Sequence, residues 1–366
     1  MGVKKVSFLL SCFFSLLLIF TGCSNSTQEK AGSQTNNSEG NENTKDEKEG
    51  TYTFKVASPS APEDPDSQFI YKAFMDKATE LSDGRVQFEW YPSQQLGQMG
   101  DYIQMTADGV ADIGMFSASV FPSELSLANK VTAIPGLYSN AYEGSMAFHA
   151  VSQKSPMMDE FLKHGVRPLV ATTTPTFNFY SKGVEVKVPS DLKGLRVRTS
   201  AGTLSEIIKM AGGTPVGIPA ADIYEAYDKG AVDVLHQYAA SDTAYGIREL
   251  SEWGSMNLGF SAGTTGLMIG EKLWKSLPVD IQKVLKEAGD FVASNGSATY
   301  DKDVKDREQR WIKNKDVALQ EVTDEERKKW QKFFKDFEKS FLEKEDSKEF
   351  KTVLEQFKEE VEKVKE

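Results

Sequence analysis

Arg198 is the residue whose setting in the sequence most clearly predicts binding chemistry. It lies in the segment 193–200, where Leu195 and Val197 would face one side of a short strand and Arg196 and Arg198 the other. A guanidinium group at the end of a strand can grip a carboxylate through two parallel, charge-assisted hydrogen bonds. The alternative is a surface strand whose two arginines form ordinary salt bridges, and the segment alone leaves both interpretations open.

The residues after Arg198 predict a helix that begins close to it. Thr203 and Glu206 have the spacing of a capping box, and apolar residues then recur at helical spacing, namely Leu204, Ile207, Ile208 and Ala211. Arg198 would therefore lie near the carboxyl end of a strand and beside a helix N-terminus. Open α/β sheets bind ligands at that place, and unpaired backbone N–H groups there favour negative charge. We expect an anion at Arg198.

Strand and helix patterns alternate along the chain. Segments 52–57, 86–91 and 111–116 are typical of strands, and residues with helical periodicity lie between them. This order predicts an α/β fold with a mostly parallel sheet covered by helices. The loop 58–61 and the residues after 116 would meet a ligand at the carboxyl ends of these strands. Further strands are expected at 166–172, 177–181, 232–237 and 267–269.

A serine in a glycine-rich segment suggests an esterase as an alternative. Residues 259–263 match the nucleophile-elbow pattern of α/β-hydrolases, with Ser261 as the nucleophile. In that fold the catalytic histidine follows the serine, whereas the histidines of this chain all precede it, at His149, His164 and His236. Residues 264–269 also have the pattern of a strand where the elbow requires a helix. We therefore expect no enzymatic activity.

Composition argues against several other classes. The 366-residue chain carries 43 Lys and Arg against 54 Asp and Glu, and the resulting net charge of −11 suits a nucleic-acid-binding protein poorly. The histidines and cysteines lack the spacing of a transition-metal site, and no acidic loop matches a calcium hand. A phosphate-cradling Gly-Lys-Ser/Thr loop is also missing. The sequence implies no metal and no cofactor.

The N-terminus has the pattern of a lipoprotein signal. Two lysines precede the apolar run 6–20, which is short for a membrane span, and residues 20–23, Phe-Thr-Gly-Cys, resemble a lipobox. Residues 1–22 would be removed as a signal peptide, and Cys23 would carry the lipid. An uncleaved anchor is the alternative. The remainder of 23–50 is polar and would form a disordered tether.

Several ordered motifs resemble the solute-binding subunit of TRAP (tripartite ATP-independent periplasmic) transporters, the DctP family. The resemblance spans residues 51–322. Its motifs are WYPSQQLG at 90–97, GVADIG at 109–114, VP at 188–189, GLRVR at 194–198, AGGTPV at 211–216, ADIYEA at 221–226, GAVD at 230–233 and WKSLPVDIQ at 274–282. Because the motifs follow the family's order over this length, they identify the family more strongly together than singly.

This resemblance implies a two-lobed, periplasmic-binding-protein-like fold with mixed, mostly parallel sheets. Lobe I would comprise residues 51–174 and 263–300, and lobe II residues 175–262. A long helix and a following strand within 278–320 would brace both lobes. Outside the resemblance, residues 323–366 would form C-terminal helices, because aromatic residues recur there at helical spacing, at Trp330, Phe333, Phe334, Phe337 and Phe341. This aromatic stripe would pack onto the body, or alternatively onto a partner helix.

The resemblance also assigns roles to individual residues. Arg198 stands at the position where the family has an arginine that grips the carboxylate of the solute. Gln237 stands at the position where the family has an amide or aromatic side chain that contacts the solute. Arg196 is expected to be structural and Asp233 to fix a turn. Further expected contacts are the polar Asn178, Ser117 and His236 and the apolar walls Phe116, Phe179 and Tyr238. A structural histidine is the alternative interpretation of His236.

Two departures from the family bear on the solute. Asn178 stands where some members carry a second arginine, and Ala220 where some place an aromatic ring over the solute. A single strong cation suits one carboxylate better than two. We therefore expect an organic monocarboxylate.

Together these features predict a lipid-anchored, extracytoplasmic receptor. It would close its lobes on an organic carboxylate and deliver it to the small and large TRAP membrane subunits, which use an ion gradient. A receptor for an ATP-driven importer or for a sensor is the alternative.

Overall fold

The computed structural model describes residues 50–199, 202–218, 222–260 and 262–366. The chain divides into two units, residues 1–48 and 49–366, and the fold below is that of the second unit. The signal peptide predicted at 1–22, the lipidation site Cys23 and nearly all of the tether predicted at 23–50 lie outside the described residues. Ser261 and Ala220 lie outside them as well.

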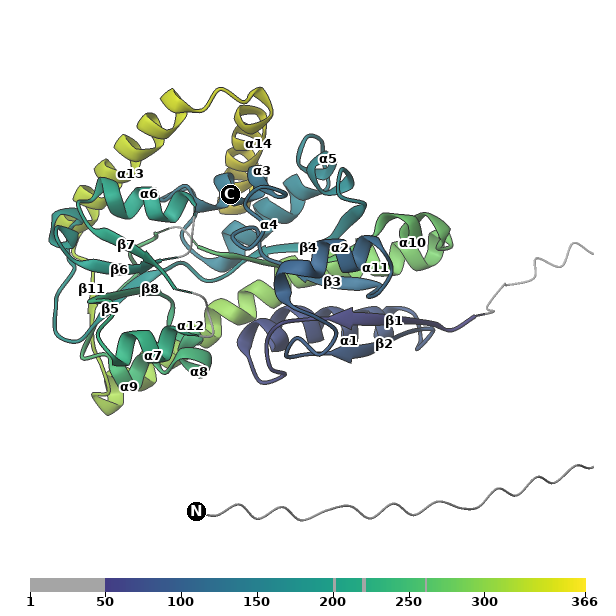
Figure 1. The fold of residues 1–366 in the computed structure, drawn as a ribbon, viewed down its shortest axis with the longest axis horizontal. Coiled ribbons are helices and arrows are strands. Elements are labelled where there is room, and N and C mark those ends of the chain that lie inside the picture. Colours follow the sequence, from purple (N-terminus) through teal and green to yellow (C-terminus); the bar gives the residue numbers. More distant parts are fainter. Residues whose placement is uncertain (1–49, 200–201, 219–221, 261) are drawn as a thin grey trace, which may run out of the picture. The chain divides into compact units, whose positions relative to one another are not determined.

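The first sheet has five strands in the order β2-β1-β3-β10-β4. β1 pairs in parallel with β2 and β3, whereas β10 runs antiparallel to β3 and β4. The strands are β1 Tyr52–Ala57, β2 Val86–Tyr91, β3 Ile113–Phe116, β4 Val166–Thr173 and β10 Thr264–Gly270. We call this sheet and the helices packed on it lobe I (Figure 1).

The second sheet has six strands in the order β11-β9-β5-β8-β6-β7. β6 is parallel to β7 and β8, β5 is antiparallel to β8 and β9, and β11 is parallel to β9. The strands are β5 Asn178–Ser181, β6 Arg196–Thr199, β7 Thr214–Gly217, β8 Val234–Gln237, β9 Trp253–Met256 and β11 Ala318–Glu321. We call this sheet with its helices lobe II. The predicted α/β class with two mixed sheets is confirmed.

The chain passes from the first sheet to the second between β4 and β5 and returns between β9 and β10. It then adds β11 to the edge of the second sheet. The residue limits predicted for the two lobes as rigid bodies stay a prediction.

Helices run between the strands of both sheets. Those that follow strands of the first sheet are η1 Ser67–Lys72, α1 Ala73–Leu81, η2 Met99–Asp101, α2 Tyr102–Ala107, α3 Ser126–Ala133, α4 Ala141–Ser152, α5 Met157–Leu162 and α10 Glu271–Ser276. Those that follow strands of the second sheet are η3 Pro189–Leu192, α6 Thr203–Met210, α7 Ile223–Asp228, η5 Ala239–Ser241, α8 Asp242–Tyr245 and α9 Ile247–Leu250.

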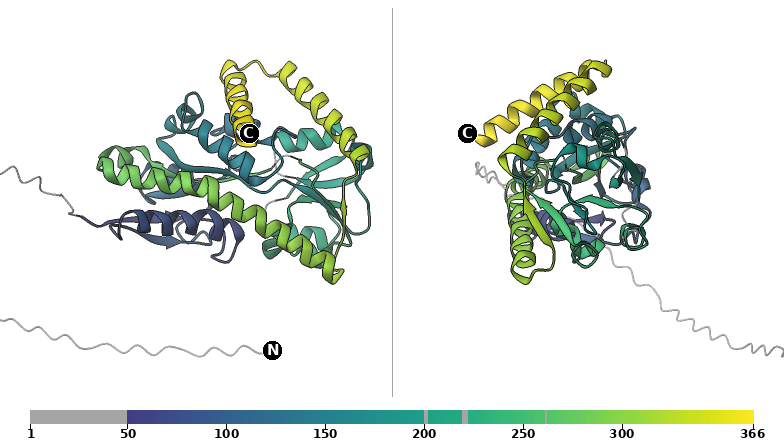
Figure 2. Two further views of the ribbon diagram at one scale, coloured as in Figure 1. Left: turned by 180° about the vertical axis from the view of Figure 1, so that it is seen from behind. Right: turned by 90° about the vertical axis from the view of Figure 1, so that its left-hand side faces the viewer.

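One long helical run contacts both lobes. It consists of α11 Val279–Phe291, the π-helical turn η6 Val292–Gly296 and α12 Ser297–Asn314 (Figure 2). α11 packs against α1 and β4 of lobe I, and α12 contacts η5 and β11 of lobe II. Its buried apolar stripe includes Ile281 and Leu285. The long helix expected from the sequence is therefore present.

The start of α6 differs from the sequence prediction. Its N-cap is Gly202, with a φ of 80°, and the side chains form no capping hydrogen bond there. Glycine adopts a positive φ without steric cost. Thr203 is therefore the first residue of the helix, and the capping box predicted from Thr203 and Glu206 is wrong.

Two charged helices end the chain, α13 Asp324–Lys344 and α14 Lys348–Lys365. Trp330, Phe334 and Phe337 of α13 are buried, as the helical stripe predicts. The Trp330 indole N–H donates a hydrogen bond to the Lys187 carbonyl oxygen at 2.8 Å, on lobe II. α14 packs on α3 and α4 of lobe I. The aromatic stripe thus packs onto the body of the protein.

Candidate ligand-binding site

Arg198 is buried in lobe II, and no described acidic residue pairs with it. It lies in β6, and only 6% of its surface is exposed. Its Nη2 donates to the Ile218 carbonyl oxygen at 3.1 Å, while its Nε has no hydrogen-bond partner among the described residues. Burial lowers the pKa of this guanidinium, because a low-dielectric environment disfavours the charged form. Within the described part of the chain, no Asp or Glu forms an ion pair with it.

Arg196, two residues earlier, pairs with an aspartate. Its Nη2 donates to Asp233 Oδ1 at 2.6 Å and its Nε to Asp233 Oδ2 at 3.1 Å. The Arg196 backbone N–H also donates to this carboxylate, at 2.8 Å. The pair lowers the pKa of Asp233. The structural roles expected for Arg196 and Asp233 are confirmed, which leaves Arg198 as the guanidinium of this strand without a carboxylate.

Asn178 and Gln237 share the sheet face of Arg198. Arg198 lies opposite Leu235, and Asn178 lies opposite Gln237. Because side chains alternate along a strand, Leu235 and Gln237 point to the same side of the sheet. Both amide residues are buried, at 5% and 4% exposure, and Asn178 Oδ1 accepts a hydrogen bond from the Leu258 backbone N–H at 3.3 Å. The register therefore groups three of the predicted site residues.

His236 and Phe179 point to the other face. They lie opposite each other across β8 and β5, with ring centroids 5.1 Å apart. The imidazole is fully buried between the rings of Phe177, Phe179 and Phe260, and neither of its nitrogens has a hydrogen-bond partner. Burial, and secondarily the charge of Arg198, lower its pKa to about 3. The structure thus separates these two residues from the face of Arg198 and places them in an aromatic core.

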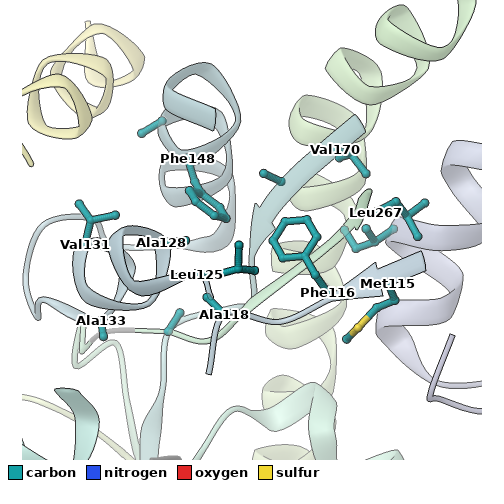
Figure 3. Close-up of a cluster of buried hydrophobic side chains, with 14 of the residues drawn as sticks. Met115, Phe116, Ala118, Leu125, Ala128, Val131, Ala133, Phe148, Val170 and Leu267 are labelled. Atoms are coloured by element: carbon teal, nitrogen blue, oxygen red, sulfur yellow. The ribbon is translucent and has the colours of Figure 1, made fainter. Parts of the chain in front are cut away.

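Phe116 belongs to the core of lobe I. It is fully buried, and its ring packs edge-on against that of Phe161 with centroids 5.0 Å apart. Figure 3 shows it within a cluster that includes Leu125, Phe148, Val170 and Leu267. Its side chain points into this cluster, and the role of Phe116 as a wall of the site stays a prediction. Ser117, the next residue, is 8% exposed and its Oγ lies 3.2 Å from Ser119 Oγ.

Tyr238 directly follows β8 and connects the two lobes. Its ring stacks on Phe177, with centroids 5.6 Å apart. Its hydroxyl lies 3.2 Å from that of Tyr300 in α12, and Tyr300 donates to Asp66 Oδ1 of lobe I at 2.8 Å. Since Tyr300 has a single hydroxyl hydrogen, the Tyr238 hydroxyl is the donor between the two tyrosines. A chain of hydrogen bonds therefore runs from β8 to the segment after β1.

Asp64 and Asp66 are residues that sequence reasoning missed. The Asp66 backbone N–H donates to Asp64 Oδ1 at 2.9 Å. Burial and the negative charge of Asp64 raise the pKa of Asp66 to about 7, although the hydrogen bond from Tyr300 acts in the opposite direction. Tyr245 of α8 lies within electrostatic range of both carboxylates and of Arg198. The available signal was the predicted ligand loop 58–61, which ends three residues before Asp64.

The candidate residues are covered in this conformation. Arg198, Gln237, Asn178, Ser117 and Tyr238 are all at most 8% exposed. An open hollow of about 510 Å³ lies elsewhere, between α13 and α14, and is lined by Lys335, Glu338, Lys339, Leu342, Glu343 and Lys351. In this conformation, little of any of these five side chains is open to solvent.

Comparison with known proteins identifies the family. The profile of DctP, the bacterial extracellular solute-binding protein family 7, matches residues 56–345, which is most of the chain. The chain belongs to this family. DctP proteins are solute-binding receptors, not enzymes. A solute-binding protein of Albidiferax ferrireducens is 23% identical over 228 residues, covering 60% of this chain and 65% of that relative, slightly less than two thirds of its length.

Solved DctP structures share the fold. A TRAP solute-binding protein from Rhodoferax ferrireducens, in complex with copurified benzoate, is 23% identical with a TM-score of 0.74, covering 86% of this chain and 99% of that one. A marine metagenome TRAP solute-binding protein specific for aromatic acids, with 3-hydroxybenzoate, is 17% identical with a TM-score of 0.78, covering 87% and 100%. The recognition of a TRAP solute-binding protein is confirmed. Among the described helices, none is long and apolar enough to cross a membrane.

Proposed function

We propose that this DctP protein is a lipid-anchored extracytoplasmic receptor that captures an organic monocarboxylate between its lobes. In this role it delivers the solute to the small and large membrane subunits of a TRAP transporter. The observation that carries the proposal is the Arg198 guanidinium, which is 6% exposed and has no carboxylate partner among the described residues.

The energetics of Arg198 favour an anionic ligand. A buried charge without a partner is costly, because desolvation is not offset by an opposing charge. The neighbouring Arg196 shows the alternative within the same strand, since Asp233 neutralises it. A solute carboxylate would supply the charge that Arg198 lacks, and the unpartnered Nε is one donor for it.

Lobe closure would make this interaction strong. The covered site residues require the lobes to separate before a solute can enter. When the lobes close again, water leaves the ion pair, and the attraction between the charges rises as the local dielectric falls. A solute that binds the closed form better shifts the population toward it.

The rest of the site supports a single carboxylate. Asn178 and Gln237, on the face of Arg198, are neutral. The Rhodoferax and marine relatives hold benzoate and 3-hydroxybenzoate, which each carry one carboxylate. The membrane anchor in this proposal is Cys23, with residues 23–50 as the tether.

The hydrolase alternative loses support. The residues after Ser261 form the strand β10, Thr264–Gly270, whereas a nucleophile elbow leads into a helix.

A thermal-shift screen over carboxylates tests the proposal. Since a ligand that binds only the native state raises the melting temperature, we expect a subset of small monocarboxylates to stabilise the wild-type protein. The same compounds should leave Arg198→Ala unchanged. Stabilisation by uncharged amides of the same acids, or equal stabilisation of both proteins, would contradict the proposal.

A further inference from the structure

Helix α6 begins at a glycine that cannot cap it. Gly202 is the N-cap residue, with a φ of 80°, and it has no side chain to form a capping hydrogen bond. The first N–H groups of a helix lack partners within the helix, and a side-chain oxygen at the N-cap usually accepts from one of them. Because α6 receives no cap from its own N-cap residue, it can take one from another part of the molecule.

The side chain of Asn129 in α3 reaches this place. A Cβ atom at Gly202 would lie 2.9 Å from Asn129 Nδ2, so a larger residue at this position would collide with the amide. Asn129 is 9% exposed, and its side-chain amide forms no hydrogen bond with any other described residue. Burying an amide without hydrogen bonds is unfavourable. A half-turn of the amide group would point its oxygen at the first N–H groups of α6 and would supply a partner to both.

This contact joins the two lobes. α3 is fixed in lobe I, where Glu160 Oε1 accepts the Leu127 backbone N–H at 2.7 Å and Glu160 Oε2 accepts that of Ala128 at 3.2 Å. Figure 3 shows Ala128 and Val131 of α3 in the buried cluster of this lobe. α6 instead packs on β6 and β7 of lobe II. Asn129 therefore approaches the backbone of lobe II from a helix that is anchored in lobe I.

The segment that Asn129 contacts follows the strand of Arg198. β6 ends at Thr199, and Gly202 comes three residues later. A contact at Gly202 therefore holds against lobe I the segment that leaves the carboxyl end of β6. When the lobes separate, this contact breaks and both of its groups return to water.

We propose that Asn129 is a closure residue, whose amide caps α6 across the boundary between the lobes and thereby retains the captured solute without touching it. This inference rests on the proposed function and adds to it a residue of lobe I. A hydrogen bond that forms only in the closed form shifts the population toward that form. Since it forms after the solute has entered, its loss should speed dissociation and leave the association rate unchanged.

Calorimetry and stopped-flow kinetics of Asn129→Ala test this proposal. The probe is the monocarboxylate that most raises the melting temperature of the wild type in the carboxylate screen. Because a neutral hydrogen bond makes a modest net contribution, we expect Asn129→Ala to bind this probe roughly 2- to 10-fold more weakly, through faster dissociation. Asn314→Ala is the matched control, since it removes an exposed amide at the end of α12, and it should bind like the wild type.

A second pair of variants separates a cap from a passive contact. Alanine at Gly202 displaces the amide, so adding Asn129→Ala to Gly202→Ala should weaken binding no further, whereas independent residues give additive losses. The backbone strain of alanine at a φ of 80° is common to both proteins and cancels in this comparison. Melting temperatures without solute verify that each variant folds.

Wild-type affinity and dissociation rate in Asn129→Ala would overturn the proposal, as would additive losses in the double variant. In both outcomes carboxylate binding that depends on Arg198 still stands. If no monocarboxylate binds the wild type, the proposed function itself fails, and this inference fails with it.

Discussion

Arg196 holds the carboxylate of Asp233 through two side-chain hydrogen bonds, 2.6 and 3.1 Å long. This pairing connects the start of β6 to the turn before β8. It occupies the carboxylate of Asp233, which lies next to Arg196 in the pairing of these strands. Arg198, two residues on, has no such neighbour among the described residues. Two arginines in one strand therefore have different tasks, and the difference follows from the position of a single aspartate.

The Arg196–Asp233 pair should matter little for binding. Its side chains are 47% and 31% exposed, and water weakens an ion pair at such a site. We expect Arg196→Ala to bind the solute with wild-type affinity and to lower the melting temperature only slightly. Thermal unfolding and calorimetry of the variant measure both quantities. A large loss of affinity would mean that the two arginines act together.

His236 is predicted to be replaceable by an aromatic residue. Both of its nitrogens are buried without partners, and its ring already packs among phenylalanines. Replacing an unsatisfied polar ring with an apolar one of similar shape is neutral or stabilising. We expect His236→Phe to unfold at the same or a higher urea concentration than the wild type. Marked destabilisation would show that the imidazole has a hydrogen-bonding role.

Trp330 should be a main support of the contact between α13 and lobe II. Its side chain is fully buried, and its indole N–H donates to the Lys187 carbonyl oxygen. Truncation leaves a cavity, so we expect Trp330→Ala to lower the free energy of unfolding by about 3–5 kcal/mol. Val279, which is 81% exposed, provides the matched control, since Val279→Ala removes no packing. Equal urea midpoints for the two variants would contradict the packing described.

Asp66 should make the ligand-free protein less stable as the pH rises. Its folded-state pKa is about 7, above the ordinary value of 3.8, so the folded protein holds this proton more tightly than the unfolded chain. The stabilisation is complete below about pH 4 and is lost as the pH rises through 7. Asp64 acts directly on the Asp66 carboxyl. The other titratable groups that interact with Asp66 or with Asp64 are Tyr71, Tyr238, Tyr245, Tyr300 and Arg307.

Urea unfolding at pH 5 and pH 8 measures this effect. Other buried acids, such as Glu308, also titrate in this range, so the comparison is between wild type and Asp66→Asn. We expect the wild type to lose more stability than the variant between the two pH values, by on the order of 1–3 kcal/mol. Identical losses would show that Asp66 ionises in the folded protein as it does in water.

Much of the fold could be predicted from local patterns. The alternation in 52–57 and 86–91 predicted β1 and β2, whereas the long helix within 278–320 was expected from the resemblance to the DctP family. The short strands β7 and β9 were missed. Thr214–Gly217 contains a proline and a glycine, and Trp253–Met256 contains a glycine, so neither has the composition typical of a strand.

Local sequence patterns predicted only part of the candidate site. The position of Arg198 at the end of a strand is a local feature and was visible in the sequence. The face on which His236 lies depends on the register of β8 with β5 and β6, and a register is set by pairings between distant segments. Asp66 and Tyr300 are 234 residues apart, and no spacing rule connects them. Such contacts arise only when the long helix crosses both lobes.

The most direct test of the account is the affinity of Arg198→Ala for a solute found in the carboxylate screen, measured by titration calorimetry beside Arg196→Ala. Loss of the buried charge partner should weaken binding by about 2–5 kcal/mol in Arg198→Ala. Arg196→Ala, which removes a guanidinium from the same strand, should retain wild-type affinity. Near-normal binding by Arg198→Ala, with the protein folded, would contradict the claim that this guanidinium holds the solute carboxylate.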